Sequence, residues 1–114
     1  MTDAQTYEIA PNAPLADMMA WLERHGINLL RIPGHMREGT ALYLLYGIPP
    51  GSFAEAVFSN DLLGAFGRAD DVNTAHMREW AHFVYNEMPI GAHGSRENVE
   101  AWIRRGGLLH YRVS

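Results

Sequence analysis

The chain of 114 residues contains no cysteine and no lysine. Without cysteine it cannot form a disulfide or a thiolate metal site, and this composition is typical of a cytoplasmic protein. All nine basic residues are arginine, which a GC-rich genome would also produce. Arginine does form bidentate contacts with carboxylates and phosphates better than lysine, but composition alone does not assign these residues a role.

Long apolar runs are also missing. The apolar run at residues 41–46 is far shorter than the roughly 20 residues that a membrane-spanning helix needs. The first eight residues are polar and acidic, with no basic region leading into an apolar one, so no secretion signal is expected. We therefore expect a soluble cytoplasmic protein with no membrane partner.

No catalytic signature is present in the sequence. The glycines match neither the phosphate-binding nor the dinucleotide-binding pattern, and no histidine stands beside a serine or aspartate with the character of a triad. Glu79 and His82 have the spacing of a di-iron Glu-x-x-His pair, but the second pair that such a site needs is missing. The sequence therefore predicts no enzyme, no cofactor and no metal site. A small metal-dependent enzyme that uses this pair is the less favoured alternative.

Charge is distributed unevenly along the chain. The net charge at neutral pH is −4; residues 1–30 and residues 52–75 each carry −3, whereas residues 95–114 carry +2. Proteins that bind nucleic acid directly usually have the opposite balance, because phosphate neutralisation dominates their affinity. Direct nucleic-acid binding is therefore disfavoured. The carboxylates of the second acidic segment are the candidate partner contacts: Glu55, Asp61, Asp70 and Asp71.

The length and apolar pattern predict one domain that spans residues 1–114, with a flexible tail at residues 1–13. The fold class expected is mostly α, as an α+β fold with about five helices and a small two-stranded β element. The two strands are expected at residues 27–32 and 108–113, because both segments are rich in branched apolar residues and follow turn formers. Helices are expected after Pro14, over residues 35–46, after a Ser52–Glu55 capping box, over residues 71–88 and after Ser95.

Polar residues recur between these helices and admit two interpretations. Asn60, Asp61, Asp70, Asn73 and Asn86 either cap helices and bind backbone groups at turns, or line a face that meets a partner. The first interpretation is favoured, and both can hold at once. Trp21, Trp80 and Trp102 stand at helical core positions, which favours packing over ligand stacking.

The central block carries a family resemblance. Its residues Gly47-Ile-Pro-Pro-Gly-Ser-Phe53, Asn60-Asp-Leu62, Ala69-Asp70 with Asn73, Tyr85-Asn86 with Pro89, and Gly94-Ser95 with Trp102 stand in order over about half of the chain. This block resembles a family of small proteins of unknown function from bacteriophages and prophages. The resemblance implies a phage context and no known reaction.

A small, acidic, cysteine-free phage-type protein is similar in kind to the anti-CRISPR inhibitors, many of which bind a host interference complex. A carboxylate surface can occupy arginine and lysine sites in place of DNA phosphates, and so mimic DNA. Our leading hypothesis is a non-enzymatic inhibitor that binds a host protein complex in this way. The alternative is a small structural or accessory phage protein that oligomerises through an apolar helix face.

Overall fold

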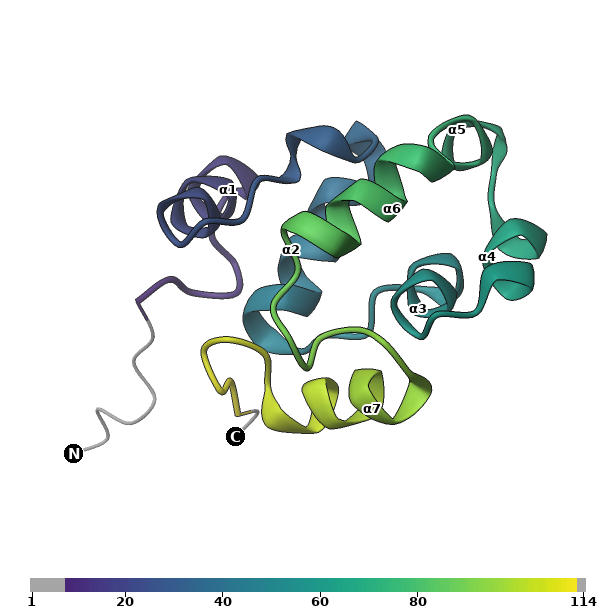
Figure 1. Ribbon diagram of the computed structural model, residues 1–114. Helices are drawn as coiled ribbons and strands as arrows, with labels where there is room; N and C mark the ends of the chain where they lie inside the picture. Colours follow the sequence, from purple (N-terminus) through teal and green to yellow (C-terminus); the bar gives the residue numbers. More distant parts are fainter. Residues whose placement is uncertain (1–7, 113–114) are drawn as a thin grey trace.

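The computed structural model describes residues 8–112, which fold into seven α-helices and two short 3₁₀ helices (Figure 1). The elements in chain order are α1 (Leu15–Arg24), η2 (Leu29–Arg31), η3 (Gly34–Met36), α2 (Arg37–Tyr46), α3 (Ser52–Phe58), α4 (Leu62–Arg68), α5 (Asp71–Ala75), α6 (Met77–Asn86) and α7 (Arg96–Arg105). The mostly α prediction is confirmed. No strand occurs within residues 8–112, so the predicted two-stranded β element is wrong.

Helix α2 lies in the middle of the fold between α1, α6 and α7, and α4 and α5 lie farther out, beyond α3 and α6 (Figure 1). Its last four residues, Tyr43 to Tyr46, are all buried, as are Thr40 and Ala41. A helix that is apolar on nearly every side must be covered on nearly every side. Helix α2 therefore forms the core against which the amphipathic helices α1, α6 and α7 bury one face each.

The first predicted strand, residues 27–32, is instead a turn of 3₁₀ helix. The Asn28 side chain accepts a hydrogen bond from the N–H of Leu30, which favours a turn over an extended chain. The Arg37 guanidinium also donates to the carbonyls of Leu29, Leu30 and Ile32 at 2.9–3.2 Å. These are carbonyls that a neighbouring strand would otherwise have used.

The second predicted strand, residues 108–113, is also wrong over the part that the structure describes; residue 113 lies outside it. Residues 108–110 form a turn, and the N–H groups of Leu108 and Leu109 donate to the carbonyls of Leu44 and Leu45 at 2.8 and 3.0 Å. The last carbonyls of a helix have no partner within the helix. The C-terminal turn supplies those partners to α2, so these apolar residues cap a helix.

Several predicted helix boundaries are confirmed. Asp61, Asp70 and Ser95 each accept a hydrogen bond from a backbone N–H of the helix that follows. Gly47 ends α2 in the left-handed conformation, with φ of 71°. The Ser52–Glu55 capping box is wrong, because Gly51 occupies the cap position and no side chain bonds the first turn of α3.

The helix predicted over residues 71–88 is two helices. His76 separates α5 from α6 with φ of −115° and ψ of 22°, and its ring nitrogen Nδ1 lies 2.8 Å from the carbonyl oxygen of Val72. A side chain that bonds a carbonyl of the preceding turn competes with the helical hydrogen bonds. The break turns α6 relative to α5 and sets the direction in which α6 presents its side chains.

The three tryptophans lie in the core, as predicted. Each indole N–H has an acceptor: Glu8 for Trp21, Asn73 for Trp80 and the carbonyl of Tyr43 for Trp102. Buried indoles need such partners.

The predicted flexible tail, residues 1–13, falls partly outside the described residues. Within residues 8–13, the Ile9 carbonyl accepts a hydrogen bond from the Tyr46 hydroxyl at 2.9 Å, and Glu8 accepts from Trp21. Residues 8–13 are therefore tied to the core. Among residues 8–112, no helix has the length and apolar character needed to cross a membrane.

Candidate functional site

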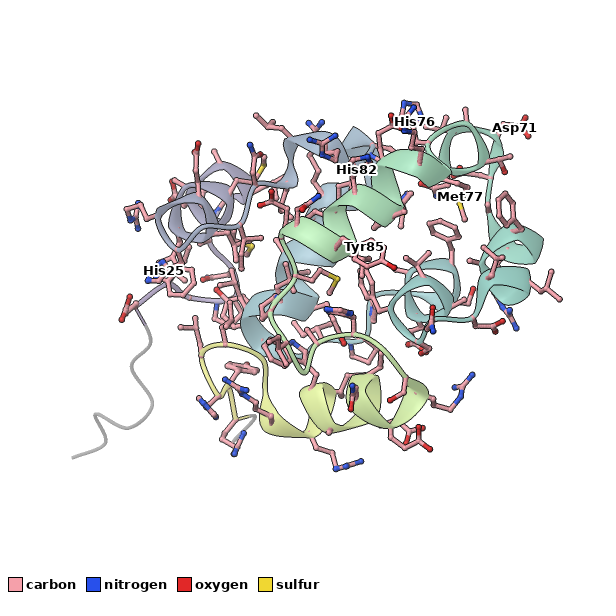
Figure 2. All side chains as sticks on the ribbon, in the orientation of Figure 1. His25, Asp71, His76, Met77, His82 and Tyr85 are labelled. Carbon is pink, nitrogen blue, oxygen red and sulfur yellow. The ribbon has the colours of Figure 1, made fainter. Side chains whose placement is uncertain are left out.

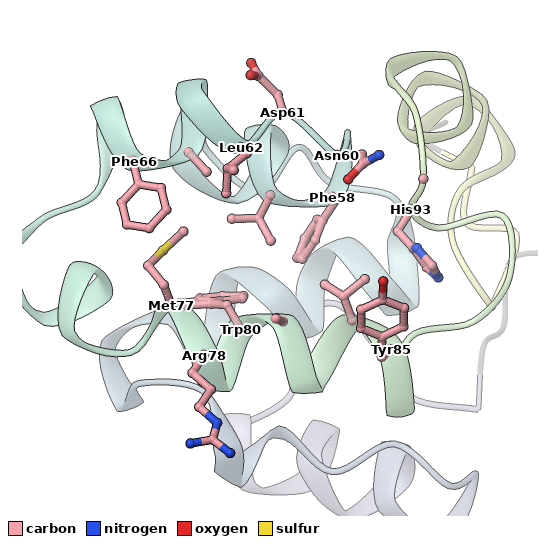
Figure 3. A pocket seen from close by; sticks show the side chains of 15 residues that line it. Phe58, Asn60, Asp61, Leu62, Phe66, Met77, Arg78, Trp80, Tyr85 and His93 are labelled. Carbon is pink, nitrogen blue, oxygen red and sulfur yellow. The ribbon is translucent and has the colours of Figure 1, made fainter.

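A groove of about 540 Å³ separates α4 from α6 (Figure 3). We call it the α4–α6 groove. Its lining is mainly apolar and comes from α3, α4, α6 and the turn around His93. The α3 and α4 side contributes Val57, Phe58, Leu62, Ala65 and Phe66, and the α6 side contributes Met77, Trp80, Ala81, Val84 and Tyr85.

The floor and the edges of the groove differ in exposure. Phe58 and Trp80 form the floor, and both side chains are almost fully buried. Along the edges, Leu62, Phe66 and Tyr85 are 65%, 48% and 88% exposed. Such a concentration of large exposed apolar side chains beside a concave surface is typical of a binding site and uncommon on a monomer without one.

The wall formed by α6 follows from its sequence. Met77, Ala81, Val84 and Tyr85 recur at helical spacing beside the buried pair Trp80 and Phe83. The apolar surface of α6 is therefore wider than one buried face. Trp80 and Phe83 point into the core, and the apolar side chains beside them line the groove. Figure 2 shows Met77 and Tyr85 on the side of α6 that faces α3 and α4.

The opposite wall depends on a tight turn between α3 and α4. Asn60 adopts a left-handed φ of 66°, which asparagine tolerates better than most residues. The Asp61 N–H bonds the Ala56 carbonyl at 2.9 Å, and the Asp61 side chain then caps α4. This turn folds α4 back along α3 and holds Leu62 and Phe66 at the edge of the groove.

Few polar side chains line the groove. Asn60 and Asp61 come from the α3–α4 turn, Arg78 from α6 and His93 from the turn before α7. Partial burial lowers the pKa of His93 from its usual 6.5, so that its neutral form is favoured near neutral pH. The groove therefore offers an apolar surface with isolated charges at its rim, which suits a partner surface better than a small polar substrate.

The four candidate acidic contacts are not equivalent in the structure. Asp71 is exposed at the start of α5, and Asp61 lines the groove while it caps α4. Asp70 caps α5 through the N–H of Asn73 at 2.7 Å and lies 2.9 Å from the His35 ring nitrogen. The Asn73 hydrogen bond, followed by the contact with His35, lowers the pKa of Asp70 below its usual 3.8.

Glu55 differs most from the prediction of a surface contact. The Glu55 side chain is partly buried. The pKa of the Tyr43 hydroxyl is raised, mainly because that hydroxyl is buried and in addition because of the negative charge of Glu55. Of the four carboxylates, Asp61 and Asp71 are thus the better placed to meet a partner, and whether any of them does so stays a prediction.

The polar residues with two interpretations have structural roles in the fold. Asn73 is buried and accepts from Trp80, and Asn86 donates to the carbonyl of His82 at 3.0 Å. Glu79 lines a smaller surface pocket with Asn28, Arg31 and Glu87. In the stretch from Glu8 to Arg112, no three histidine, aspartate or glutamate side chains are placed to hold a metal, and the Glu79–His82 pair has no third ligand beside it.

The groove itself was not predicted from the sequence. Leu62, Phe66, Met77 and Val84 fit helical stripes, and the spacing alone does not distinguish a buried stripe from one that lines a groove. Two signals were available: Gly64 and Gly67 weaken α4 as a core helix, and α6 has more apolar positions than one buried face needs.

Comparison with known proteins gives no relative: no family model, no curated protein and no solved structure matches this chain. The resemblance of the central block to phage proteins and the expectation of anti-CRISPR activity therefore stay predictions.

Proposed function

We propose that this protein is a non-enzymatic, phage-encoded inhibitor that binds a host defence complex and captures a basic amphipathic helix of that complex in the α4–α6 groove. The observation that carries the proposal is the groove, with its buried aromatic floor and the exposed edges Leu62, Phe66 and Tyr85. The phage context rests on the resemblance of the central block.

The shape of the groove favours a helix as its occupant. The lining residues of α6 extend from Met77 to Tyr85, which is a rise of about 12 Å along the helix axis. A partner helix of two to three turns, with apolar residues at helical spacing, would match this length and insert its side chains between α4 and α6. The buried aromatic floor would then be the centre of the contact, where binding energy concentrates.

The negative charge of the segment beside the groove favours a partner that carries basic residues. The segment that forms α3, α4 and α5 carries a net charge of −3 over residues 52–75, and Asp61 stands at the rim of the groove. Complexes that hold nucleic acid are rich in arginine and lysine, and opposite charges at the rim accelerate and orient association. Bound there, the protein would occupy a surface that the complex uses for DNA.

The test is a plaquing assay in hosts with active CRISPR systems of several types, infected with a phage that each system targets. Cells that express the protein should allow plaques in one type, and that interference complex should then be retained by the purified protein. Absence of rescue in every type would contradict the proposed function and would favour the accessory-protein alternative.

A second arm of the assay tests the two exposed carboxylates Asp61 and Asp71. The Asp61→Asn/Asp71→Asn variant removes two charges and keeps the cap of α4, because asparagine is an equally good cap residue. The matched control is Glu97→Gln/Glu100→Gln, which removes two exposed charges from α7. Rescue should fall in the first variant only. Equal rescue by the two variants would show that Asp61 and Asp71 do not contact the partner.

A further inference from the structure

A second, smaller pocket of about 380 Å³ lies between η2 and α6, and we call it the η2–α6 pocket. Its lining residues are Asn28, Leu30, Arg31, Glu79 and Glu87. The volume falls within the range of small-molecule sites, about 300–1,000 Å³. At about 100° per residue, Glu79 lies about 160° around α6 from Ala81, which lines the α4–α6 groove. The η2–α6 pocket is therefore on the other side of α6 from the groove.

The pocket brings together opposite charges that are not paired with one another. Glu79 and Glu87 are partly buried, and Arg31 is exposed. Within residues 8–112, none of these three side chains forms an ion pair. Partial burial without a counter-charge disfavours a carboxylate. A ligand with complementary charges would supply the partners that the protein itself does not.

Both walls of the pocket are held in place by hydrogen bonds. The Asn28 side chain accepts from the N–H of Leu30 at 2.8 Å, and the Arg37 guanidinium donates to three backbone carbonyls of the same segment. The Glu87 carboxylate accepts from the Asn28 N–H at 2.7 Å, which joins α6 to η2 and fixes that carboxylate. The backbone that carries Arg31 is thus ordered before a ligand arrives, and preorganisation lowers the cost of binding.

We propose that the η2–α6 pocket binds a free basic α-amino acid, the class to which arginine and lysine belong. Such a molecule has one carboxylate and two cationic groups, and the pocket has one guanidinium and two carboxylates. Arg31 binds the carboxylate of the ligand through parallel N–H groups, and Glu79 and Glu87 bind its two cationic groups. Leu30 is 60% exposed and supplies an apolar wall for the alkyl chain.

The spacing of the two carboxylates favours a ligand with two separate cationic groups. Glu79 and Glu87 are eight residues apart on α6 and in the turn that follows it, which corresponds to a helical rise of about 12 Å. Two cationic groups joined by an alkyl chain reach carboxylates at this spacing more readily than a single cation does. A neutral amino acid would leave one carboxylate without a partner. The charge pattern therefore selects basic amino acids over other zwitterions.

An amide NMR titration of the whole protein with L-arginine, at constant ionic strength, tests the proposal. The N–H groups of Asn28 and Leu30 are hydrogen-bonded at the pocket, so their signals report on it. These signals should shift and saturate by about 10 mM ligand, well above a millimolar dissociation constant. The signals of Leu62 and Gly94, which line the groove, should stay in place. Absence of a saturable shift at Asn28 and Leu30 would overturn the proposal.

Two analogues of arginine test the ligand class. L-citrulline has nearly the same shape without the side-chain charge, and agmatine lacks the carboxylate. Each should bind about fivefold or more weakly than L-arginine, because one charged contact is lost. An analogue that binds as tightly as L-arginine would show that the pocket does not recognise basic amino acids as a class.

Protein variants test the assigned contacts. Arg31→Gln and Glu79→Gln should each weaken binding of L-arginine about fivefold or more. The matched controls are Arg24→Gln and Glu23→Gln, which remove the same charges from exposed positions on α1 outside the pocket. The controls should bind as the wild type does. Equal loss in a variant and its control would show that net charge, and not the pocket, attracts the ligand.

This inference goes beyond the proposed function, and the two fail separately. Glu79→Gln should rescue plaquing as the wild type does, because Glu79 does not line the α4–α6 groove. A protein that rescues plaquing without binding L-arginine would overturn the amino-acid site alone. A protein that binds L-arginine and rescues no plaquing would overturn the proposed inhibitor alone.

Discussion

The indole N–H of Trp80 donates a hydrogen bond to the side-chain oxygen of Asn73 at 3.0 Å, and both side chains are almost fully buried. This bond links α5 to α6 across the break at His76. It also fixes the ring that forms the floor of the α4–α6 groove. One buried asparagine therefore connects the stability of the fold with the shape of the candidate site.

Asn73→Ala should lower the free energy of unfolding by about 1–3 kcal/mol, because the Trp80 N–H is left buried without its acceptor. Urea denaturation measures the change. Asn86→Ala is the control: Asn86 is exposed, and its loss should cost less than about 0.5 kcal/mol. Equal effects of the two substitutions would contradict the role given to the Asn73–Trp80 bond.

Gly107→Ala should be strongly destabilising, by more than about 2 kcal/mol. Gly107 has a φ of +71°, and an added methyl group would lie 2.6 Å from backbone atoms of Leu45 and Tyr46. These are the atoms against which the C-terminal turn caps α2, so they have little freedom to shift. The thermal unfolding midpoint measures the effect.

Gly67→Ala serves as its control. The added methyl group meets no neighbour, and alanine favours a helix more than glycine does, so the variant should be as stable as the wild type or more stable. If Gly107→Ala were as well tolerated as Gly67→Ala, the close approach of the C-terminal turn to α2 would be wrong.

The Asp70 carboxylate should make stability depend on pH. Its pKa is lower in the folded protein than the usual 3.8, so the charged form favours folding. This contribution is present above about pH 4 and is lost as the pH falls through the folded-state pKa. Asp70→Asn keeps a cap on α5 and removes the titration.

Urea midpoints of both proteins between pH 7 and pH 2 measure this difference. The advantage of the wild type over Asp70→Asn should be largest near neutral pH and should shrink in acid. An advantage that is constant over this range would contradict the assignment.

His93 should titrate below its usual pKa of 6.5, because partial burial at the end of the groove disfavours the imidazolium form. Since the folded-state pKa is the lower one, the contribution of this group to stability is complete above pH 6.5 and is lost as the pH falls through the folded-state value. The NMR shift of the His93 ring proton against pH measures the value. A pKa at or above 6.5 would show that this end of the groove is open to water.

Several helix ends could be predicted because their signals are local. Asp61, Asp70 and Ser95 bond an N–H three residues ahead, and Gly47 ends α2 through its own φ. The tryptophans were placed in the core correctly because a helical stripe reports burial. The capping box failed because Gly51, which precedes Ser52, begins the helix instead.

The strands and the groove depend on partners distant in the sequence. Residues 27–32 and 108–112 have the composition of strands, yet Arg37 and the end of α2 take their backbone groups. Leu62, Phe66 and Met77 have the spacing of core residues, and only the turn at Asn60 and the break at His76 leave them facing a groove. No local pattern distinguishes an apolar stripe that is covered from one that is left open.

The measurement that tests the central claim most directly is the plaquing assay repeated with Tyr85→Ala and Ile90→Ala. Both replace a highly exposed apolar side chain, but only Tyr85 lines the α4–α6 groove, so neither should affect folding and only one should affect binding. The account predicts that Tyr85→Ala lowers rescue by about tenfold or more, because tyrosine is among the side chains whose loss weakens an interface most, and that Ile90→Ala matches the wild type. Full rescue by Tyr85→Ala would contradict the claim that the groove is where the partner binds.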